Sequence, residues 1–374
     1  MQVLDLFPHQ QSVVSSDRLL TSLHDIVSNV EINSNFCIRH PHYKPLELPA
    51  EMVERFQKVP LELQNKYLSL QLRGFLYGIY YNGSLHSTLA PDADTVDLSL
   101  HQDLANNTVL GVDPEFYHRL HTSNKGEGYF DAGWQVIKQE SDGTLAVSKG
   151  GLTLHIEPER HLESAQRAAT VDDVVAIRMP RNLVQNGFYI AVSNVGVGDN
   201  LNPDFQTVRT YFNLTPEGAV AVMENLTEQL NRINIPFTFK VLYNPADYKR
   251  YDSGVLYFDK SNYEIIRSVL ETVYTNNQTN FKADVPLFTK LLAPGLALAE
   301  EPNIRFTAQE SFGMNRCQIV ANGLLQAQHQ GDESLENRMN SILEQFSLLG
   351  INWQHPYLNA NSEDIYTPLT YVDC

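Results

Sequence analysis

The stretch FTFKVLYNPADYKRYD, residues 237–252, contains the side chains of this chain that are best suited to chemistry on an anion. Its first half alternates like a half-buried strand, in which Lys240 points away from the apolar side chains. Its second half places Arg250 in a loop rich in tyrosine. Because the chain carries a formal net charge of -17, a local group of cations indicates a bound anion that compensates their mutual repulsion.

Two further strands are predicted close to this stretch, at residues 207–214 and 254–260. Alternation in the first strand places Arg209 and Tyr211 on one face, and alternation in the second points Tyr257 outward. If the three strands are neighbours, these side chains and Lys240 converge on one face of a sheet. Arg250 then reaches the same face from its loop.

Cations and phenols on one rigid sheet face fit the β-elimination of phosphate. The planar guanidinium of arginine donates in parallel to two phosphate oxygens. A lysine crowded by arginines has a lowered pKa, which supplies a neutral amine as a general base. A phenol can deliver a proton or hydrogen-bond a developing charge. The alternative interpretation is a solvated sheet face, on which Lys and Arg side chains extend into water.

Two other segments contain candidate residues. His155, in LTLHIEPERH, lies near a strand end, where it is either an auxiliary acid or phosphate contact or part of an ordinary surface strand. Arg316, in ESFGMNRCQIVANGL, needs a partner, which is either an anion or an acid such as Glu310. The acidic loop APDADTVD lacks the glycine and the terminal glutamate of a calcium loop. We expect no metal site and no cofactor.

The composition predicts a soluble, cytoplasmic protein. The excess of 44 acidic over 27 basic residues argues against nucleic acid or an anionic membrane as the main partner. The 3 cysteines are far apart and odd in number, which indicates a reducing compartment. The start, MQVLDLFPHQ, shows no secretory signal, and no apolar run approaches membrane-spanning length.

The predicted elements indicate an α+β fold in two parts. Residues 1–125 are expected to be mainly helical, because apolar residues recur there at three- and four-residue spacing. Residues 126–374 are expected to form a mixed, largely antiparallel sheet domain with a β-α-β-β-α core. The final segment returns to helix and is expected to end in a loose polar tail.

Two helix starts can be predicted inside that core. The first helix should begin with Thr215 as N-cap and Pro216 at the first helical position. The second should begin with a capping box formed by Ser261 and Glu264.

Four segments resemble the HopA family of type III secretion effectors and its bacterial relatives. They are GYFDAGWQVI to HIEPERHL, TVRTYFNLTPEGAVAVMENLTEQLN, FKVLYNPADYKRYDSGVLYF, and FTKLLAPGLALAEEP with ESFGMNRCQIVANGL, within residues 70–345. The resemblance implies an α+β fold related to the bacterial phosphothreonine lyases. Relatives in lanthipeptide and thioamitide biosynthesis work with a kinase-like phosphotransferase. They eliminate phosphate from phosphorylated Ser or Thr of a precursor peptide and leave dehydroamino acids.

The resemblance also implies roles for individual residues. Lys240 matches the catalytic lysine base of the phosphothreonine lyases, and Arg250 matches their phosphate-binding arginine. Tyr257 matches a tyrosine on the strand that follows, and Arg316 is the candidate for a later arginine.

One position departs from the lyase pattern. Arg209, Thr210 and Tyr211 stand where those enzymes have a lysine, an aromatic residue and the histidine acid. Either Tyr211 or another group such as His155 therefore assists the leaving oxygen, or the protein binds phosphopeptides without cleaving them.

The sequence thus predicts a carbon–oxygen lyase that eliminates phosphate from phosphoserine or phosphothreonine in a peptide. Lys240 would abstract the α-proton, while Arg209, Arg250 and Arg316 hold the phosphate. The expected partners are the phosphorylated peptide and a kinase-like phosphotransferase. The alternative is a non-catalytic, effector-like module that binds a phosphorylated or acidic protein.

Overall fold

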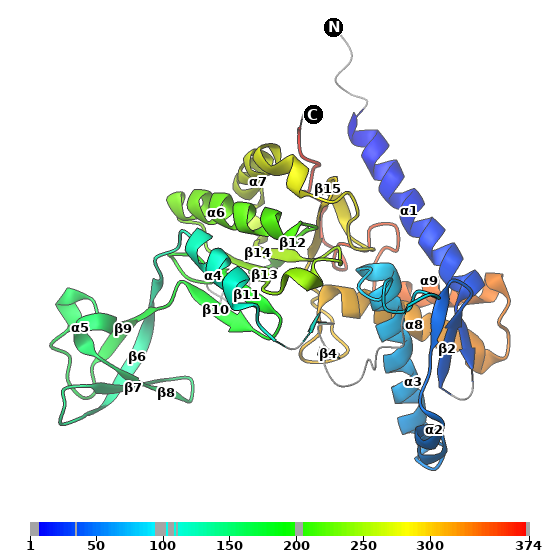
Figure 1. Cartoon of the computed structure of the whole chain (residues 1–374), viewed down its shortest axis with the longest axis horizontal. Coiled ribbons are helices and arrows are strands. Elements are labelled where there is room, and N and C mark those ends of the chain that lie inside the picture. Colours follow the sequence, from blue (N-terminus) through cyan, green and yellow to red (C-terminus); the bar gives the residue numbers. More distant parts are fainter. Residues whose placement is uncertain are drawn as a thin grey trace, which may run out of the picture.

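The computed structural model has the predicted α+β architecture, with a seven-stranded sheet between helices and a smaller sheet that projects to one side (Figure 1). The structure describes residues 7–33, 36–93, 102–103, 108–109, 111–198 and 205–371.

The central sheet contains the three strands that the sequence placed next to one another. Its strands, in spatial order, are β10 (Asn182–Gln185), β11 (Phe188–Val192), β13 (Thr238–Leu242), β14 (Gly254–Asp259), β12 (Thr207–Phe212), β16 (Leu296–Glu300) and β15 (Lys290–Ala293). Each neighbouring pair in this sheet is antiparallel. Because β14 lies between β13 and β12, alternating side chains of these three strands do share a face.

One face of the central sheet is covered by α6 (Pro216–Arg232) and α7 (Tyr263–Asn277), and α4 (Pro114–Ser123) packs against α6 (Figure 1). On this face the ring of Phe212 lies 5.3 Å from that of Phe239 and 6.1 Å from that of Phe281. Phe281 in turn lies 4.8 Å from Tyr274 of α7. These apolar contacts bury the face and drive its packing against the helices.

The two predicted helix starts had different outcomes. The hydroxyl of Thr215 accepts a hydrogen bond from the backbone N–H three residues on, which confirms it as N-cap of α6. The capping box of Ser261 and Glu264 was wrong. Asn262 is the N-cap of α7, because the side chain of Asp259 accepts from the backbone N–H of Ser261 and holds the preceding residues in a 3₁₀ turn.

The first part of the chain contains helices and, in addition, strands that the sequence did not predict. The helices are α1 (Phe7–Asn29), α2 (Ala50–Phe56) and α3 (Leu61–Leu76), with a π-helical turn at Tyr77–Tyr81. The strands are β1 (Glu31–Asn33), β2 (Cys37–His40) and β3 (Tyr43–Leu46) in one antiparallel sheet, and β4 (Gln102–Asp103) paired with β5 (Thr108–Val109).

A long helix, α8 (Phe312–Gln330), was missed by the sequence analysis because it is buried almost all round and lacks an amphipathic stripe. It begins with Ser311 as N-cap and ends at Gly331, which adopts φ 74°. It packs against α3 on one side and α9 (Leu335–Leu348) on another, so helices from both ends of the chain form one layer. The ring of Phe312 lies 6.3 Å from that of Tyr211, on the second face of the central sheet.

The smaller lobe is a four-stranded antiparallel sheet that projects from the rest of the molecule (Figure 1). Its strands, in spatial order, are β8 (Leu152–Ile156), β7 (Leu145–Lys149), β6 (Tyr129–Gln139) and β9 (Val174–Met179), and it carries the short helix α5 (Pro158–His161). Trp134 and Leu145 belong to a small core of its own. These strands agree with the alternating segments of the sequence.

The expectation of a loose C-terminal tail was wrong for the residues up to 371. Residues 351–371 form no helix or strand, yet Tyr366 is only 2% exposed and Leu369 only 5%. The backbone N–H of Leu369 donates to the carbonyl of Leu292 on β15 at 3.0 Å. Aromatic and aliphatic side chains within a mostly polar segment hold it on the sheet, because their burial is favourable.

Candidate functional site

The cross-strand register places the predicted side chains on one face of the central sheet, opposite α6 and α7. Arg209 pairs with Tyr257 across β12 and β14, and Tyr211 pairs with Val255. Lys240 on β13 also pairs with Val255. Directly opposed residues point to the same side of a sheet. We call the side chains of Arg209, Tyr211, Lys240 and Tyr257 the Lys240 face.

Lys240 is half-buried among apolar and aromatic groups. Its Nζ lies 4.6 Å from the ring centroid of Phe188 and 5.4 Å from that of Tyr257. Its cross-strand neighbours, Ile190 and Val255, are apolar. Within the described part of the chain, no carboxylate forms an ion pair with this ammonium, whereas other lysines of the sheet region do pair with acids. The ring contacts attract the ammonium without accepting ordinary hydrogen bonds from it, so its N–H groups are available to a substrate.

Arg209 contacts the ring of Tyr257, as Lys240 does, and has an acidic partner, Glu301. Its Nε donates to the carboxylate of Glu301, and its guanidinium lies 5.1 Å from the ring centroid of Tyr257. Burial opposes the charge of Arg209, but Tyr257 and Glu301 outweigh burial and raise its pKa. Glu301 also accepts from Nη2 of Arg305 at 2.8 Å. Two guanidinium groups therefore meet at one carboxylate at this end of the face.

Arg250 lies near the Lys240 face but is not displayed on it. Its side chain is 3% exposed, and its Nη2 donates to Oδ2 of Asp252 at 2.8 Å. Burial opposes ionisation of Asp252, but Arg250, Asn82 and the nearby Lys240 outweigh burial and lower its pKa. The predicted phosphate contact is thus corrected in part. The loop does bring Arg250 close, but an acid two residues later already binds its guanidinium.

Tyr211 faces the right way and is too deeply buried for the acid role that the sequence assigned to it. It is 2% exposed, and its ring lies 6.4 Å from Tyr81 and 6.3 Å from Phe312. Burial raises the pKa of its hydroxyl above the usual value for a phenol, which makes it a weaker proton donor. Helix α8 and the π turn cover this end of the face, which the sequence could not show.

His155 does not join the Lys240 face. It is an exposed residue of β8 that pairs with Ala146, and β8 is one of the two edge strands of the projecting four-stranded sheet (Figure 1). Its proposed role as acid is therefore wrong for this arrangement. The physical reason is that the β-meander forms a lobe with its own core instead of extending the central sheet.

Arg316 is bound by backbone carbonyls of the C-terminal segment. It is 1% exposed, and its Nε and Nη2 donate to the backbone carbonyls of Pro356 at 2.7 Å and Leu358 at 3.0 Å. Burial lowers the pKa of Arg316 to about 10. Its guanidinium holds the C-terminal segment in place. The predicted phosphate contact is wrong, and so is the alternative of a salt bridge to Glu310.

Four residues around the face were missed by the sequence analysis: Phe188, Asp252, Glu301 and Arg305. For Glu301 a signal was present, because alternation through LALAEE places it on the same side as the alanines that oppose Arg209 and Tyr211. No local signal identifies the other three, since their partners are distant in sequence or depend on the path of a loop.

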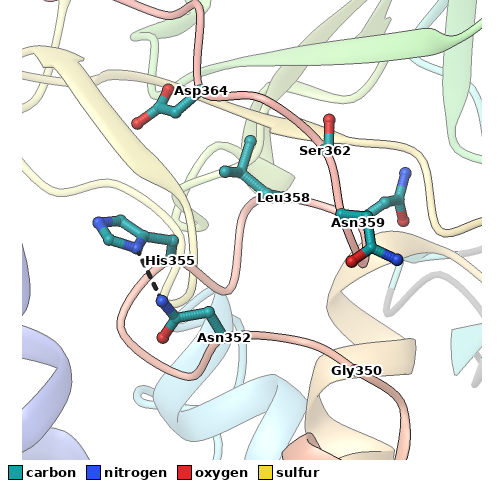
Figure 2. A pocket seen from close by; sticks show the side chains of 8 residues that line it. Gly350, Asn352, His355, Leu358, Asn359, Ser362 and Asp364 are labelled. Atoms are coloured by element: carbon teal, nitrogen blue, oxygen red, sulfur yellow. Dashed lines mark hydrogen bonds between the residues drawn. The ribbon is translucent and has the colours of Figure 1, made fainter.

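A separate cavity of about 270 Å³ lies in the C-terminal segment (Figure 2). Amide, imidazole and carboxylate groups line it, and the amide of Asn352 and Nδ1 of His355 lie 3.2 Å apart. Several lining groups already have partners in the protein. Ser362 donates to Glu300 at 2.6 Å, and Asp364 binds Lys290 at 2.7 Å. These groups stabilise the fold, so we place the candidate site at the Lys240 face.

The described residues contain neither a cluster of metal ligands nor a helix that could span a membrane. They contain no group of three or more His, Cys, Asp and Glu side chains that is arranged to bind a metal ion. Asp94 and Asp97 of the acidic loop lie outside the described residues. None of the described helices combines the length and the apolar character that a membrane crossing requires.

Comparison with known proteins supports the resemblance inferred from the sequence. Residues 179–358, which include the whole Lys240 face, match the HopA1 effector protein family, and the predicted resemblance is confirmed over this part of the chain. No curated protein matches the chain.

Two solved structures are similar at low identity. An effector protein from Pseudomonas syringae pv. syringae strain 61 is 14% identical, with a TM-score of 0.44, and the match covers 92% of this chain and 99% of the effector. An effector protein from Pseudomonas syringae pv. tomato strain DC3000 is 15% identical, with a TM-score of 0.40, over 78% of this chain and 100% of the effector. Neither likeness assigns a role to a residue.

Proposed function

We propose that this protein is a phosphoserine or phosphothreonine lyase that acts on a phosphorylated peptide, with Lys240 as the base. The observation that carries the proposal is the position of Lys240. It is a half-buried lysine without an acidic partner in the described structure, next to Arg209 and Tyr257 on a rigid sheet. A dehydrating lyase needs a base and a cation within reach of one substrate, and this face supplies both.

The reaction follows from these positions. The neutral amine of Lys240 takes the proton from Cα of the phosphorylated residue and becomes an ammonium, and the electron pair of that C–H bond forms the double bond between Cα and Cβ. The bond between Cβ and the ester oxygen breaks, and phosphate leaves with the bonding electrons. Arg209 stabilises the charge that develops on the leaving phosphate.

Tyr257 is the phenol that we assign to the leaving oxygen in place of Tyr211. Its ring lies between the Arg209 guanidinium at 5.1 Å and the Lys240 ammonium at 5.4 Å. It is half-buried, whereas Tyr211 is 2% exposed. A hydroxyl group on this side chain can hydrogen-bond a leaving phosphate that reaches both cations.

A second function, phosphopeptide binding without cleavage, is favoured by the position of the two predicted acids, since Tyr211 is only 2% exposed and His155 lies on the projecting lobe. Arg209 and Arg250 are each bound to an acid of the protein, and Arg316 is bound to backbone carbonyls. A protein that only recognises a phosphate would need these arginines more than it needs Lys240. The two functions therefore respond differently to the same substitution.

The test uses the whole 374-residue chain and a library of phosphothreonine and phosphoserine peptides. Mass spectrometry should show the loss of phosphoric acid, and Lys240→Ala should reduce the rate by about 10³-fold, the usual contribution of a general base. Product from wild type and from Lys240→Ala alike would contradict the mechanism.

The matched control is Lys249→Ala. Lys249 is an exposed lysine of the adjacent loop, and it should be dispensable for elimination. Phosphate-dependent binding without elimination, which survives Lys240→Ala, would favour the binding function instead.

A further inference from the structure

Glu301 directly follows β16 and continues its pairing with β12. Its backbone N–H donates to the carbonyl of Thr207 at 2.8 Å, two residues beyond the pair of Ala299 and Arg209. Because side chains alternate along a strand, Glu301 points to the same face as Ala299 and Arg209. The small side chain of Ala299 leaves room there for the guanidinium of its opposite neighbour.

The carboxylate of Glu301 is shared by two arginines. One oxygen accepts from Nε of Arg209, and the other accepts from Nη2 of Arg305 at 2.8 Å. The Arg305 side chain is held in this direction by the carbonyl of Pro302, to which its Nε donates at 3.1 Å. Two guanidinium groups that converge on one group of oxygens form the arrangement that proteins use to bind phosphate.

One carboxylate does not neutralise this corner of the sheet. The two arginines carry two positive charges against one negative charge, and Lys240 lies on the same face without an acidic partner among the described residues. A phosphate dianion brings twice the charge of Glu301 and more acceptor oxygens. Arg305 is also more accessible to solvent than Glu301, since its side chain is 39% exposed and that of Glu301 only 15%. The site can therefore be reached from the side of Arg305.

The loop that carries Arg305 also presents apolar side chains to solvent. Ile304 is 48% exposed and Phe306 is 42% exposed, although the backbone N–H of Phe306 is held by the buried Glu310 at 2.9 Å. Exposed apolar residues beside a cationic corner fit a ligand that has both a charged group and side chains. A phosphorylated peptide has this chemistry, and free phosphate lacks its apolar part.

We propose that Glu301 is an internal competitor for the phosphate of a phosphopeptide, and that Arg305 is a further phosphate-binding residue of the Lys240 face. This proposal rests on the proposed function of the same face. Binding of the phosphorylated residue displaces the carboxylate from Arg209 and Arg305. The competition keeps the site closed to weakly binding anions and lets a phosphate with flanking peptide contacts enter.

The test measures binding separately from chemistry. The probe is a fluorescent peptide whose phosphothreonine analogue has carbon in place of the ester oxygen, so that phosphate cannot leave. Glu301→Gln should raise its affinity at least about tenfold, because a competing charge is removed. Arg305→Gln should lower the affinity about tenfold, because one charge-assisted donor is lost. The affinity for inorganic phosphate, measured by displacement of the peptide, should increase less in Glu301→Gln than the affinity for the peptide does.

The matched control is Arg232→Gln, which changes an exposed arginine that is also bound to a glutamate but lies on α6. It should leave the affinity unchanged. Equal affinity of wild type and Glu301→Gln, or no binding by either, would overturn the proposal. Should Glu301→Gln not fold, Arg305→Gln decides alone, since its side chain is partly exposed, and unchanged binding would then refute the role of Arg305.

The elimination assay tests the lyase separately from these binding measurements. Elimination by wild type with no effect of Glu301→Gln on affinity would leave the lyase standing and remove the competitor. Tighter binding by Glu301→Gln with no elimination product would support Glu301 as a competitor for phosphate and contradict the lyase.

Discussion

Glu300 and Glu301 are neighbours in the chain, yet their side chains serve opposite faces of the central sheet. Glu300 is 1% exposed and accepts from Lys260 at 2.7 Å, Ser362 at 2.6 Å and Tyr366 at 2.9 Å. Two of these donors belong to the C-terminal segment. Glu300 therefore fastens that segment to the sheet with a fully enclosed set of hydrogen bonds.

Glu301 lies at the edge of the Lys240 face, where its partners are two arginines and one of them is partly exposed. Charged partners that reach solvent can exchange one anion for another at small cost, whereas buried donors such as the Tyr366 hydroxyl cannot be left unpaired. The comparison indicates that burial and the completeness of hydrogen bonding, more than residue type, separate the structural charges of this protein from those that we propose to bind phosphate.

The largest expected effect tests this comparison directly. Glu300→Gln should lower the free energy of unfolding by about 3 kcal/mol, because it leaves the Lys260 ammonium beside a buried network without its counter-charge. Glu301→Gln should lower it by about 1 kcal/mol, since Arg305 is 39% exposed and the amide oxygen of the glutamine can still accept from Arg209. Urea unfolding of both variants measures the difference. Equal losses would show that the two faces do not differ in this way.

Arg316→Met is expected to have the next largest effect. It should cost about 2 kcal/mol of stability, because the buried carbonyls of Pro356 and Leu358 lose their donors. The C-terminal segment should also become more sensitive to limited proteolysis. Arg160→Met is the control, since the Arg160 side chain is 71% exposed, and it should stay within about 0.5 kcal/mol of wild type. A stable Arg316→Met variant with a protected C-terminal segment would contradict the anchoring role.

The smallest effect concerns the Arg250–Asp252 pair, and it appears only in acid. The folded protein lowers the pKa of Asp252, so its contribution to stability is complete above the unfolded value of about 3.9 and is lost as pH falls through the lower folded value. Unfolding free energies measured from pH 6 downward should therefore fall more steeply for wild type than for Asp252→Asn. Asp17→Asn, at an exposed position, should follow wild type. Parallel curves for all three proteins would show that Asp252 is not stabilised as an anion.

Local patterns in the sequence were sufficient to predict the strands that carry the candidate site. Strict alternation in residues 207–212 and 238–242 separated Arg209 and Lys240 from the core side chains, and the register confirms that separation. The N-cap of α6 was equally local, because a Thr-Pro start places the hydroxyl next to the free N–H groups of its own helix. These features depend on residues a few positions apart.

The partners of the cations could not be predicted in the same way. Arg316 binds carbonyls some forty residues away in the chain. Alternation places Glu301 on one side of its strand, but only the pairing of β16 with β12 brings it to Arg209. Helix α8 was missed for a related reason, since a helix that is buried on every side has no polar face to mark its period.

The sequence by itself therefore determined which side chains lie on the Lys240 face, because the pleat of a strand alternates with every residue. Only the tertiary structure decided which of the cations there remain without an acidic partner, covered Tyr211 with Tyr81 and Phe312, and moved His155 onto a separate lobe. The reason is that the ion pairs and hydrogen bonds of a charged side chain are made with groups that folding brings close, and no local pattern of residues identifies those groups.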